Sequence, residues 1–292
     1  MRCAVFGGTG YIGSHLVRKL VEAGHAVTIL SRKTSTLPAD TLRLITGSLA
    51  QSEAVNQVLQ GADVVYHLAW EGTPATEAFH PDSDPNVKQS LKLAEQCAQH
   101  GIRRVIFCSS GGAVYGPASN LPIREDHPLR PISAYGQAKA AVEEVLAAHR
   151  LDAIVARPGN AYGGLQRTDG VQGVLGRLIW CLKHDHPFTI YTGGDVVRDF
   201  VHVEDVAEAL VALGIYAGSE RVFNIGSGVG TSISQLVELV EKSSGRQVAR
   251  QLEPARAFDV PSNILSSDLL QRETGWSARH DLAAEIRRLC AS

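Results

Sequence analysis

Residues 3–31 read CAVFGGTGYIGSHLVRKLVEAGHAVTILS, and this stretch decides the fold class. It begins with a short apolar run that ends in glycines, which is typical of a buried strand that enters a tight turn. The next segment has an apolar face at helical spacing, and Gly24 ends it. That face consists of Leu16, Val17, Leu20 and Val21. A second apolar run, AVTILS, follows, and the whole order predicts a βαβ unit with parallel strands.

The glycines of the turn predict a dinucleotide site. Gly7, Gly10 and Gly13 have G-x-x-G-x-x-G spacing between the first strand and the first helix. Glycines allow a tight turn and let the backbone approach a pyrophosphate, while the N-terminus of the helix offers free N–H groups and a partial positive charge. We therefore expect cofactor contacts from these glycines and from Tyr11 and Ile12 between them.

Strand and helix patterns alternate along the first half of the chain. ADVVYHLA, RRVIFCSS and DAIVARPG read as strands, and NVKQSLKLAEQCAQHG and ISAYGQAKAAVEEVLAAHR read as helices. This alternation predicts an α/β fold: a Rossmann-type doubly wound parallel sheet with a smaller C-terminal substrate domain. We expect a dinucleotide-binding domain over residues 1–164, to which strands from about 188–222 return. Residues 165–292 are expected to form mainly the substrate-binding domain, interleaved with the first.

The composition excludes several classes of protein. The 292-residue chain is 44% hydrophobic with a net charge of −2, so no basic field points to nucleic acid or to an anionic membrane. No apolar run approaches the ~20 residues of a membrane span, and the N-terminus begins in a strand instead of a signal peptide. Five dispersed cysteines without a C-x-x-C pair indicate reduced thiols in a cytoplasmic protein. The eleven histidines form no H-E-x-x-H, and we expect no metal site.

The end of the second strand bears on the choice of cofactor. An acid there would bind the ribose 2′-hydroxyl of NAD, but this chain has Ser31, Arg32 and Lys33. Two cations at the place of a 2′-phosphate favour NADP(H). The alternative is that both are ordinary solvated loop charges and that the cofactor is NAD.

A tyrosine and a lysine provide the candidate chemistry. YGQAK places Tyr135 and Lys139 at i and i+4, on one face of a helix. A free tyrosine has a pKa of about 10 and is a poor base at neutral pH. A nearby ammonium and an oxidised nicotinamide favour the phenolate, which can take a proton from a sugar hydroxyl while the cofactor takes the hydride.

Together these motifs resemble the extended short-chain dehydrogenase/reductases, in the nucleotide-sugar epimerase/dehydratase branch that includes UDP-glucose 4-epimerase-like proteins. The resemblance covers nearly the whole chain. Besides GGTGYIG and YGQAK it rests on HLAW (67–70), SSGGAVYG (109–116), RPGNAYGG (157–164), RDFVHVEDVAEAL (198–210) and FNIGSG (223–228). Motifs of this length in this order are specific for the superfamily, and much less specific for the substrate.

The resemblance implies a set of site residues. The dinucleotide would contact the ends of several strands, Tyr135 and Lys139, with Asn86 supporting the site. The further implied cofactor contacts are Ser48, Leu49, Leu68, Ala69, Trp70, Asn86, Ser109, Pro158 and Gly159. Asn160 would face the sugar nucleotide, and Arg198 and Arg256 would hold its diphosphate, which suits the fixed fork of a guanidinium.

The usual catalytic hydroxyl of this family is missing. Its Ser/Thr position, three residues before the valine of VYG, is Gly111 here. A threonine sometimes found directly before that valine is Ala113. Ser110 is the nearest substitute and completes the implied catalytic set with Tyr135 and Lys139, although a water or a side chain of the substrate domain could also serve.

Two further positions depart from the family pattern. Ser48 stands where the family often has an aspartate that faces the adenine. In ARAFD, Arg256 and Asp259 keep an R-x-G-D pattern, but Phe258 replaces its glycine.

The function that the resemblance implies is NAD(P)-dependent epimerisation of a nucleotide sugar at C4. Tyr135 and the oxidised cofactor would oxidise C4, the keto sugar would rotate, and the hydride would return to the other face. The main alternative is an NADPH-dependent 4-ketoreductase, which the SRK loop favours. A non-catalytic dinucleotide-binding regulator is the alternative of another class, and the missing hydroxyl keeps it open. The resemblance also implies a homodimer that packs through the helix carrying Tyr135, although the apolar stripe of AAVEEVLAA could instead pack on the sheet.

Overall fold

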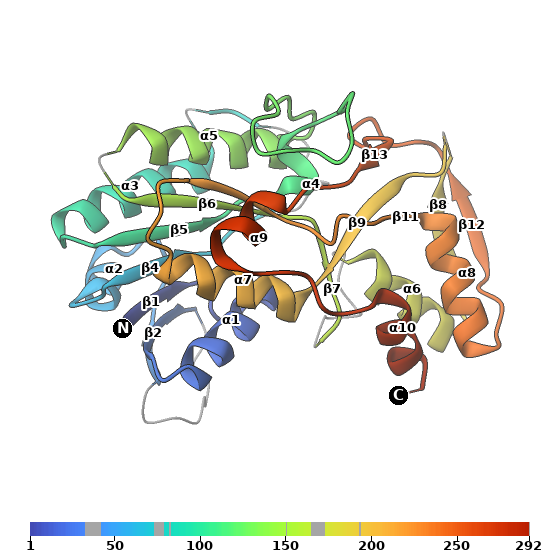
Figure 1. The fold of residues 1–292 in the computed structure, drawn as a ribbon, viewed down its shortest axis with the longest axis horizontal. Coiled ribbons are helices and arrows are strands. Elements are labelled where there is room, and N and C mark those ends of the chain that lie inside the picture. Colours follow the sequence, from blue (N-terminus) through green and yellow to red (C-terminus); the bar gives the residue numbers. More distant parts are fainter. Residues whose placement is uncertain are drawn as a thin grey trace.

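The centre of the protein is a seven-stranded parallel sheet with the strand order β10-β6-β5-β4-β1-β2-β3 (Figure 1). The computed structural model describes residues 1–32, 42–72, 79–81, 83–149, 151–164, 173–192 and 194–291. The strands of this sheet are β1 (Arg2–Phe6), β2 (Ala26–Ser31), β3 (Leu42–Thr46), β4 (Val64–His67), β5 (Arg104–Cys108), β6 (Ala153–Pro158) and β10 (Val222–Ile225). The α/β fold class predicted from the sequence is confirmed.

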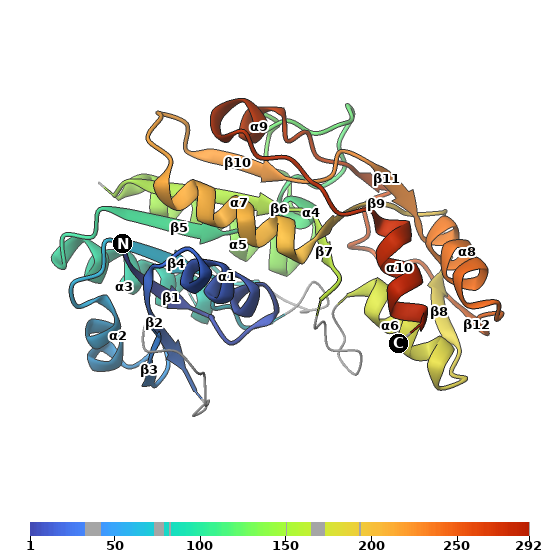
Figure 2. The same cartoon turned by 60° about the horizontal axis from the view of Figure 1, so that its bottom comes forward.

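Helices cover both faces of this sheet, which explains why its strands are apolar runs and not alternating patterns. On one face lie α1 (Tyr11–Glu22), α7 (Val203–Ile215) and α9 (Asp268–Thr274), whose apolar side chains share a core with β1 and β2 (Figure 2). On the other face lie α2 (Ser52–Leu59), α3 (Pro85–Gln99) and α5 (Ala134–Ala148). The short α4 (Gly111–Val114) follows β5.

The strand order reverses at β1. β1 pairs with β2 on one side and with β4 on the other, so the chain leaves the centre of the sheet in two directions. Ligands of open α/β sheets bind outside the carboxyl ends of the strands at such a switch point. The glycine turn that follows β1 lies at this place.

A second group of elements forms a smaller lobe beside the sheet (Figure 1). β9 (Val197–His202) pairs with β7 (Asn160–Tyr162), β11 (Gly230–Ser232) and β13 (Ser262–Asn263). β8 (Phe188–Tyr191) pairs in parallel with β12 (Arg250–Glu253). The helices α6 (Val174–Lys183), α8 (Ile233–Ser244) and α10 (Leu282–Ala291) share one apolar core with these strands.

The segment 188–222, which we expected to supply returning strands, has a different role. β8 and β9 pair within the smaller lobe, and α7 returns to the large sheet as a helix. The strand that returns is β10, Val222–Ile225, which pairs with β6 at the edge of the sheet. VHVEDVAEALVAL alternates too little for a strand and has the apolar spacing of a helix that lies on a sheet. The boundary at residue 164 stays a prediction.

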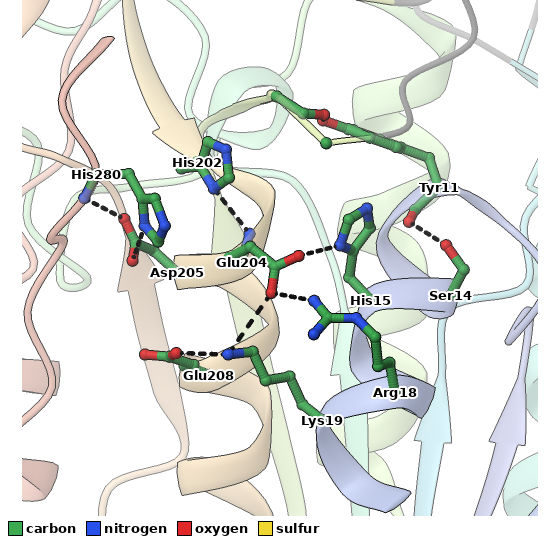
Figure 3. Close-up of polar contacts among 12 residues, drawn as sticks. Tyr11, Ser14, His15, Arg18, Lys19, His202, Glu204, Asp205, Glu208 and His280 are labelled. Atoms are coloured by element: carbon green, nitrogen blue, oxygen red, sulfur yellow. Dashed lines mark hydrogen bonds and ion pairs between the residues drawn. The ribbon is translucent and has the colours of Figure 1, made fainter. Parts of the chain in front are cut away.

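Ion pairs join α1 to α7 (Figure 3). Glu204 of α7 accepts from His15 Nδ1 and from an Arg18 Nη2, and Lys19 Nζ donates to Glu208 Oε1 at 2.8 Å. His15 is buried, whereas Arg18 stands half exposed at the rim. These contacts fix the helix that follows the glycine turn against a helix from the second half of the chain.

A buried ion pair fixes α5 to β6. Arg157 Nη2 of β6 lies 2.5 Å from Glu143 Oε2 of α5, and the two side chains are only 6% and 7% exposed. The Ser109 hydroxyl also donates to Glu143. Since Tyr135 and Lys139 belong to the same helix, this pair sets the position of the candidate catalytic side chains.

None of the helices in the described part of the chain combines the length and the apolar character that a membrane crossing requires.

We predict that Glu143→Gln lowers the free energy of unfolding by about 3–5 kcal/mol, because it leaves the Arg157 charge buried without its counter-ion. Urea unfolding followed by circular dichroism measures this. Glu144→Gln is the matched control, since Glu144 is the exposed neighbour on the same helix. Equal stability of the two variants would contradict a structural role for the pair.

Candidate functional site

The glycine turn brings backbone against backbone at the switch point. Gly7 has a φ of +88°, and a Cβ there would lie 2.5 Å from the Ala69 backbone nitrogen. A Cβ on Gly13 would overlap the Gly7 carbonyl oxygen, which also accepts from the Gly10 N–H at 2.9 Å. Only glycine fits these two positions, so the turn leaves its backbone open to a ligand.

The N-terminus of α1 fits a pyrophosphate. Gly10 is the N-cap residue and brings no capping side chain, and the first turn of the helix contains no acid. The N–H groups of the first turn and the positive end of the helix dipole therefore remain for an anion. Tyr11 turns away from this place, because its hydroxyl donates to the Gly163 carbonyl at 2.7 Å. Ile12 packs against the core of the large sheet.

The adenosine end of the predicted site is only partly described. Ser31 is buried at the end of β2, and Leu49 packs against the core. The Ser48 N–H donates to Gln51 Oε1 at 2.8 Å. Arg32 is exposed, and its Nη1 lies 3.5 Å from Glu71 Oε1. Lys33 lies outside the described residues.

The side chain of Asn86 makes two hydrogen bonds to the backbone of the loop after β4. The Asn86 Oδ1 accepts from the Glu71 N–H at 2.8 Å, and its Nδ2 donates to the Glu71 carbonyl at 2.9 Å. Leu68, Ala69 and Trp70 precede Glu71, and Leu68 continues the pairing of β4 with β1 through Phe6. Asn86 therefore holds in place the loop that Gly7 touches.

Three candidate catalytic groups converge at the start of α5. The Tyr135 phenol lies beside the Ser110 side chain; burial raises the pKa of the phenol, and Ser110 opposes the rise. Lys139 Nζ donates to the Cys108 carbonyl at 2.7 Å. Burial lowers the pKa of Lys139 to about 8. The structure thus brings a phenol, a hydroxyl and an amine together at the carboxyl end of β5.

The structure explains why residue 111 is a glycine. A Cβ at Gly111 would lie 2.6 Å from Leu265 Cδ1 and 2.9 Å from the Arg157 carbonyl oxygen, so no hydroxyl side chain fits there. At the next residue, a Cβ on Gly112 would lie 3.4 Å from Asn160 Oδ1 and 3.9 Å from Ser110 Oγ. Ser110 and Asn160 therefore face one space beside Gly112.

Ser109, Pro158 and Gly159, which the resemblance implies as cofactor contacts, lie at the carboxyl ends of β5 and β6. The Ser109 side chain is buried and bonded to Glu143, so its hydroxyl points into the core. Pro158 ends β6, and the Gly159 N–H donates to the Ile225 carbonyl at 2.9 Å.

Arg198 and Arg256 meet on one carboxylate. An Arg198 Nη2 lies 3.3 Å from Asp259 Oδ1, and Arg256 Nε lies 2.7 Å from Asp259 Oδ2. The Arg256 guanidinium lies 4.0 Å from the Tyr191 ring centroid and 5.0 Å from that of Phe258. Phe258, the replacement for the family's glycine, thus packs on the arginine. Burial lowers the pKa of Arg198, and Asp259 opposes this.

A residue that the sequence did not reveal connects these parts. Asp199 is fully buried, and its carboxylate accepts from Ser227 Oγ at 2.6 Å, from the Gly228 N–H at 3.1 Å and from the Leu265 N–H at 3.1 Å. It thereby ties FNIGSG to the segment that carries Leu265, the side chain that fills the space at Gly111. An acid inside the apolar strand RDFVH was the available signal.

No group of three or more histidine, cysteine, aspartate or glutamate side chains that could hold a metal ion occurs among the described residues. Four of the five cysteines are buried, and all five are free thiols.

Comparisons with known proteins agree with this geometry. The model of the NAD dependent epimerase/dehydratase family matches residues 3–226. A UDP-glucose 4-epimerase of Corynebacterium glutamicum is 33% identical over 305 residues, covering 96% of this chain and 92% of that protein. The solved structure of Thermotoga maritima UDP-glucose 4-epimerase with UDP-glucose has a TM-score of 0.90 and 30% identity, covering 100% and 98% of the two chains. That of the Thermus thermophilus enzyme in complex with NAD has a TM-score of 0.87 and 29% identity, with the same coverage.

We predict that Gly13→Ala weakens dinucleotide binding at least about tenfold, because the new methyl group pushes α1 away from the Gly7 carbonyl. Calorimetric titration with the dinucleotide measures the affinity. Ser14→Ala is the matched control on the same turn of the helix. An affinity of the Gly13→Ala protein equal to that of the control would disprove the assignment of the turn.

Proposed function

The chain belongs to the NAD dependent epimerase/dehydratase family and is a nucleotide-sugar epimerase, and we propose that its reaction is the interconversion of UDP-hexoses at C4. The observation that carries this proposal is the convergence of Tyr135, Ser110 and Lys139 beside the glycine turn. The relatives named UDP-glucose 4-epimerase match the chain over nearly its full length, so both the cofactor lobe and the smaller lobe have counterparts in them.

We propose the following roles for the chain's own groups. The glycine turn and the N-terminus of α1 would hold a nicotinamide dinucleotide, which would supply the acceptor and donor for the hydride at C4 of the sugar. Tyr135 takes the proton of the C4 hydroxyl and gives it back after the keto sugar has turned its other face. Ser110 donates a hydrogen bond to the reacting oxygen, and the Lys139 ammonium favours the phenolate. Asn160 contacts the sugar nucleotide beside Ser110.

Two arginines hold the part of the substrate that does not react. In our proposal Arg198 and Arg256 bind the diphosphate, and Asp259 keeps the two guanidiniums side by side before the substrate arrives. Rotation of the keto sugar between the two hydride transfers requires such an anchor outside the sugar. Arg256 contacts the rings of both Tyr191 and Phe258, which limits its movement.

The two alternatives are not favoured. A 4-ketoreductase would use only the reduction half of the cycle, whereas the relatives that match the whole chain are epimerases. The regulator hypothesis depended on a missing hydroxyl, and Ser110 places one beside Tyr135.

The homodimer through α5 and the cytoplasmic location stay predictions. Val142 and Leu146 of α5 are buried against the large sheet, so these apolar residues of the helix are not free for a dimer contact.

A nicotinamide dinucleotide is supported. The sequence predicted a preference for NADP(H), but one contact and one functional argument favour NAD. Arg32, the described cation of the SRK loop, faces Glu71, and an exposed acid there would repel a 2′-phosphate. An epimerase also has to retain and recycle its cofactor, whereas NADP(H) exchange serves reductive chemistry. We therefore propose NAD as the working cofactor.

The first experiment tests the catalytic groups by NMR of UDP-galactose conversion in the NAD-loaded protein. Tyr135→Phe should lower kcat by about 10²–10⁴-fold, because the proton transfer is lost. Ser110→Ala should lower it about 10–100-fold, which is the effect of one charge-assisted hydrogen bond. Ser109→Ala is the matched control, since it should lower stability and leave the rate nearly unchanged. A Tyr135→Phe protein that keeps most of its activity would refute the mechanism.

Arg198→Ala should weaken UDP-sugar binding by about 2–5 kcal/mol and leave the affinity for the dinucleotide nearly unchanged. Calorimetry with each ligand decides it. Arg250→Ala serves as control, because that arginine lies half exposed on β12 and pairs with Glu241. If both ligands lost affinity equally, Arg198 would have a structural role instead.

Fluorescence titration with both dinucleotides tests the cofactor. We expect NAD to bind more tightly than NADP, and Arg32→Ala to leave the affinity for NAD unchanged. If Arg32 and Lys33 bind a 2′-phosphate, the opposite result follows: NADP binds about 10–100-fold more tightly, and Arg32→Ala removes that advantage.

A further inference from the structure

The amine of Lys139 lies against three aromatic rings. Its Nζ lies 3.7 Å from the centroid of the Trp70 ring, 4.8 Å from that of Phe107 and 5.7 Å from that of Tyr135. These rings come from three elements: the loop after β4, strand β5 and helix α5. Lys139 itself is only 3% exposed. We call Trp70, Phe107 and Tyr135 the aromatic cage.

Of the three rings, Trp70 contacts Lys139 most closely and also touches both other rings. Its ring centroid lies 5.9 Å from that of Tyr135, with an interplanar angle of 78°, and 6.2 Å from that of Phe107. The edge-to-face contact with Tyr135 is one that aromatic pairs prefer. The indole therefore fixes the direction of the tyrosine ring and the place of the ammonium at the same time.

The charged groups around Lys139 offset only part of the cost of burying its ammonium. Glu143, one turn further along α5, favours the ammonium, but the same carboxylate is paired with Arg157 and Ser109. His67 on β4 is buried, and its pKa falls to about 3, so it is neutral near pH 7. The Cys108 thiol on β5 has a raised pKa and is neutral as well. Among the residues that the structure describes, Tyr135 is the remaining titratable group beside the amine.

We propose that Trp70 is a positioning residue for the hydride-transfer reaction, whose indole face keeps Lys139 charged and in place next to Tyr135. This proposal rests on the proposed function, in which the ammonium favours the phenolate. The negative face of an indole attracts an ammonium most strongly when water is excluded, as it is here. The ring thus supplies part of the stabilisation that burial removes.

The direction of the pH effect follows from this. Burial lowers the pKa of Lys139 to about 8, so the ammonium is lost as the pH rises through that value. The Trp70 face acts against this loss. Without it the pKa of Lys139 falls further, and the alkaline limb of kcat moves to lower pH.

The direct test measures the Lys139 titration in the NAD-loaded protein with ε-¹³C-lysine. Its resonance is assigned by its absence in Lys139→Met. Trp70→Leu should lower the midpoint by about 0.5–1.5 pH units, and Trp70→Phe, which restores a ring face, should lower it by less than half as much. The alkaline limb of kcat should shift in parallel. Trp180→Leu on α6 is the matched control and should leave the Lys139 midpoint unchanged.

Fluorinated tryptophan keeps the shape of the ring and covers the case in which Trp70→Leu does not fold. The chain has three tryptophans, and the side chain in contact with Lys139 is that of Trp70. Each added fluorine weakens the negative face, so the Lys139 midpoint should fall stepwise. A midpoint that is unchanged by fluorination, or equal in Trp70→Leu and wild type, overturns the proposal. Neither titration needs turnover, so a protein without epimerase activity would contradict the proposed function and leave this result readable.

Discussion

The backbone contact between Gly13 and the Gly7 carbonyl determines how α1 leaves β1, and much of the site depends on it. Because no side chain separates helix from turn, the N-terminus of α1 points at the crevice where the strand order reverses. The same helix then meets α7 through His15, Arg18 and Lys19 (Figure 3). Tyr11 extends this contact to Gly163, directly after β7. One close approach of two glycines thus aligns the cofactor end of the site with an element of the smaller lobe.

The second constraint is the burial of charge around α5. Glu143 and Arg157 neutralise each other one helical turn after Lys139, and the amine of Lys139 lies against the aromatic cage. Such an arrangement is unfavourable for stability in isolation, because each buried charge loses its hydration. It suits proton transfer, since a desolvated ammonium acts on a neighbouring phenol more strongly than a hydrated one. The catalytic helix therefore combines a structural ion pair with a reactive amine.

The local features were predictable from the sequence, and the long-range contacts were not. Apolar periodicity predicted the parallel sheet, and the glycine spacing predicted the dinucleotide turn, because both depend on residues close together in the chain. The i, i+4 spacing in YGQAK predicted that Tyr135 and Lys139 share one helix face for the same reason. Leu265, which leaves no space for a side chain at Gly111, follows that glycine by more than half the chain length. No local pattern could reveal it.

Other residues needed the folded chain for similar reasons. Asp199 is unusual as an acid in an apolar strand, but its role becomes clear only from its partners Ser227, Gly228 and Leu265. In the sequence, Phe258 is a departure from the R-x-G-D pattern. In the structure, its ring packs on the guanidinium of Arg256. We expected strands of the segment 188–222 to return to the large sheet, but β8 and β9 of this segment pair within the smaller lobe. The strand that returns is β10, which follows α7 in the chain.

The central claim is that hydrogen leaves C4 as a hydride and returns to the same carbon of the same sugar. UDP-glucose with deuterium at C4 tests it most directly, followed by NMR and by absorbance of reduced cofactor. We expect UDP-galactose that keeps its deuterium at C4, with no net reduction of the cofactor. Solvent hydrogen at C4 of the product, or steady accumulation of reduced cofactor without C4 inversion, would contradict the claim.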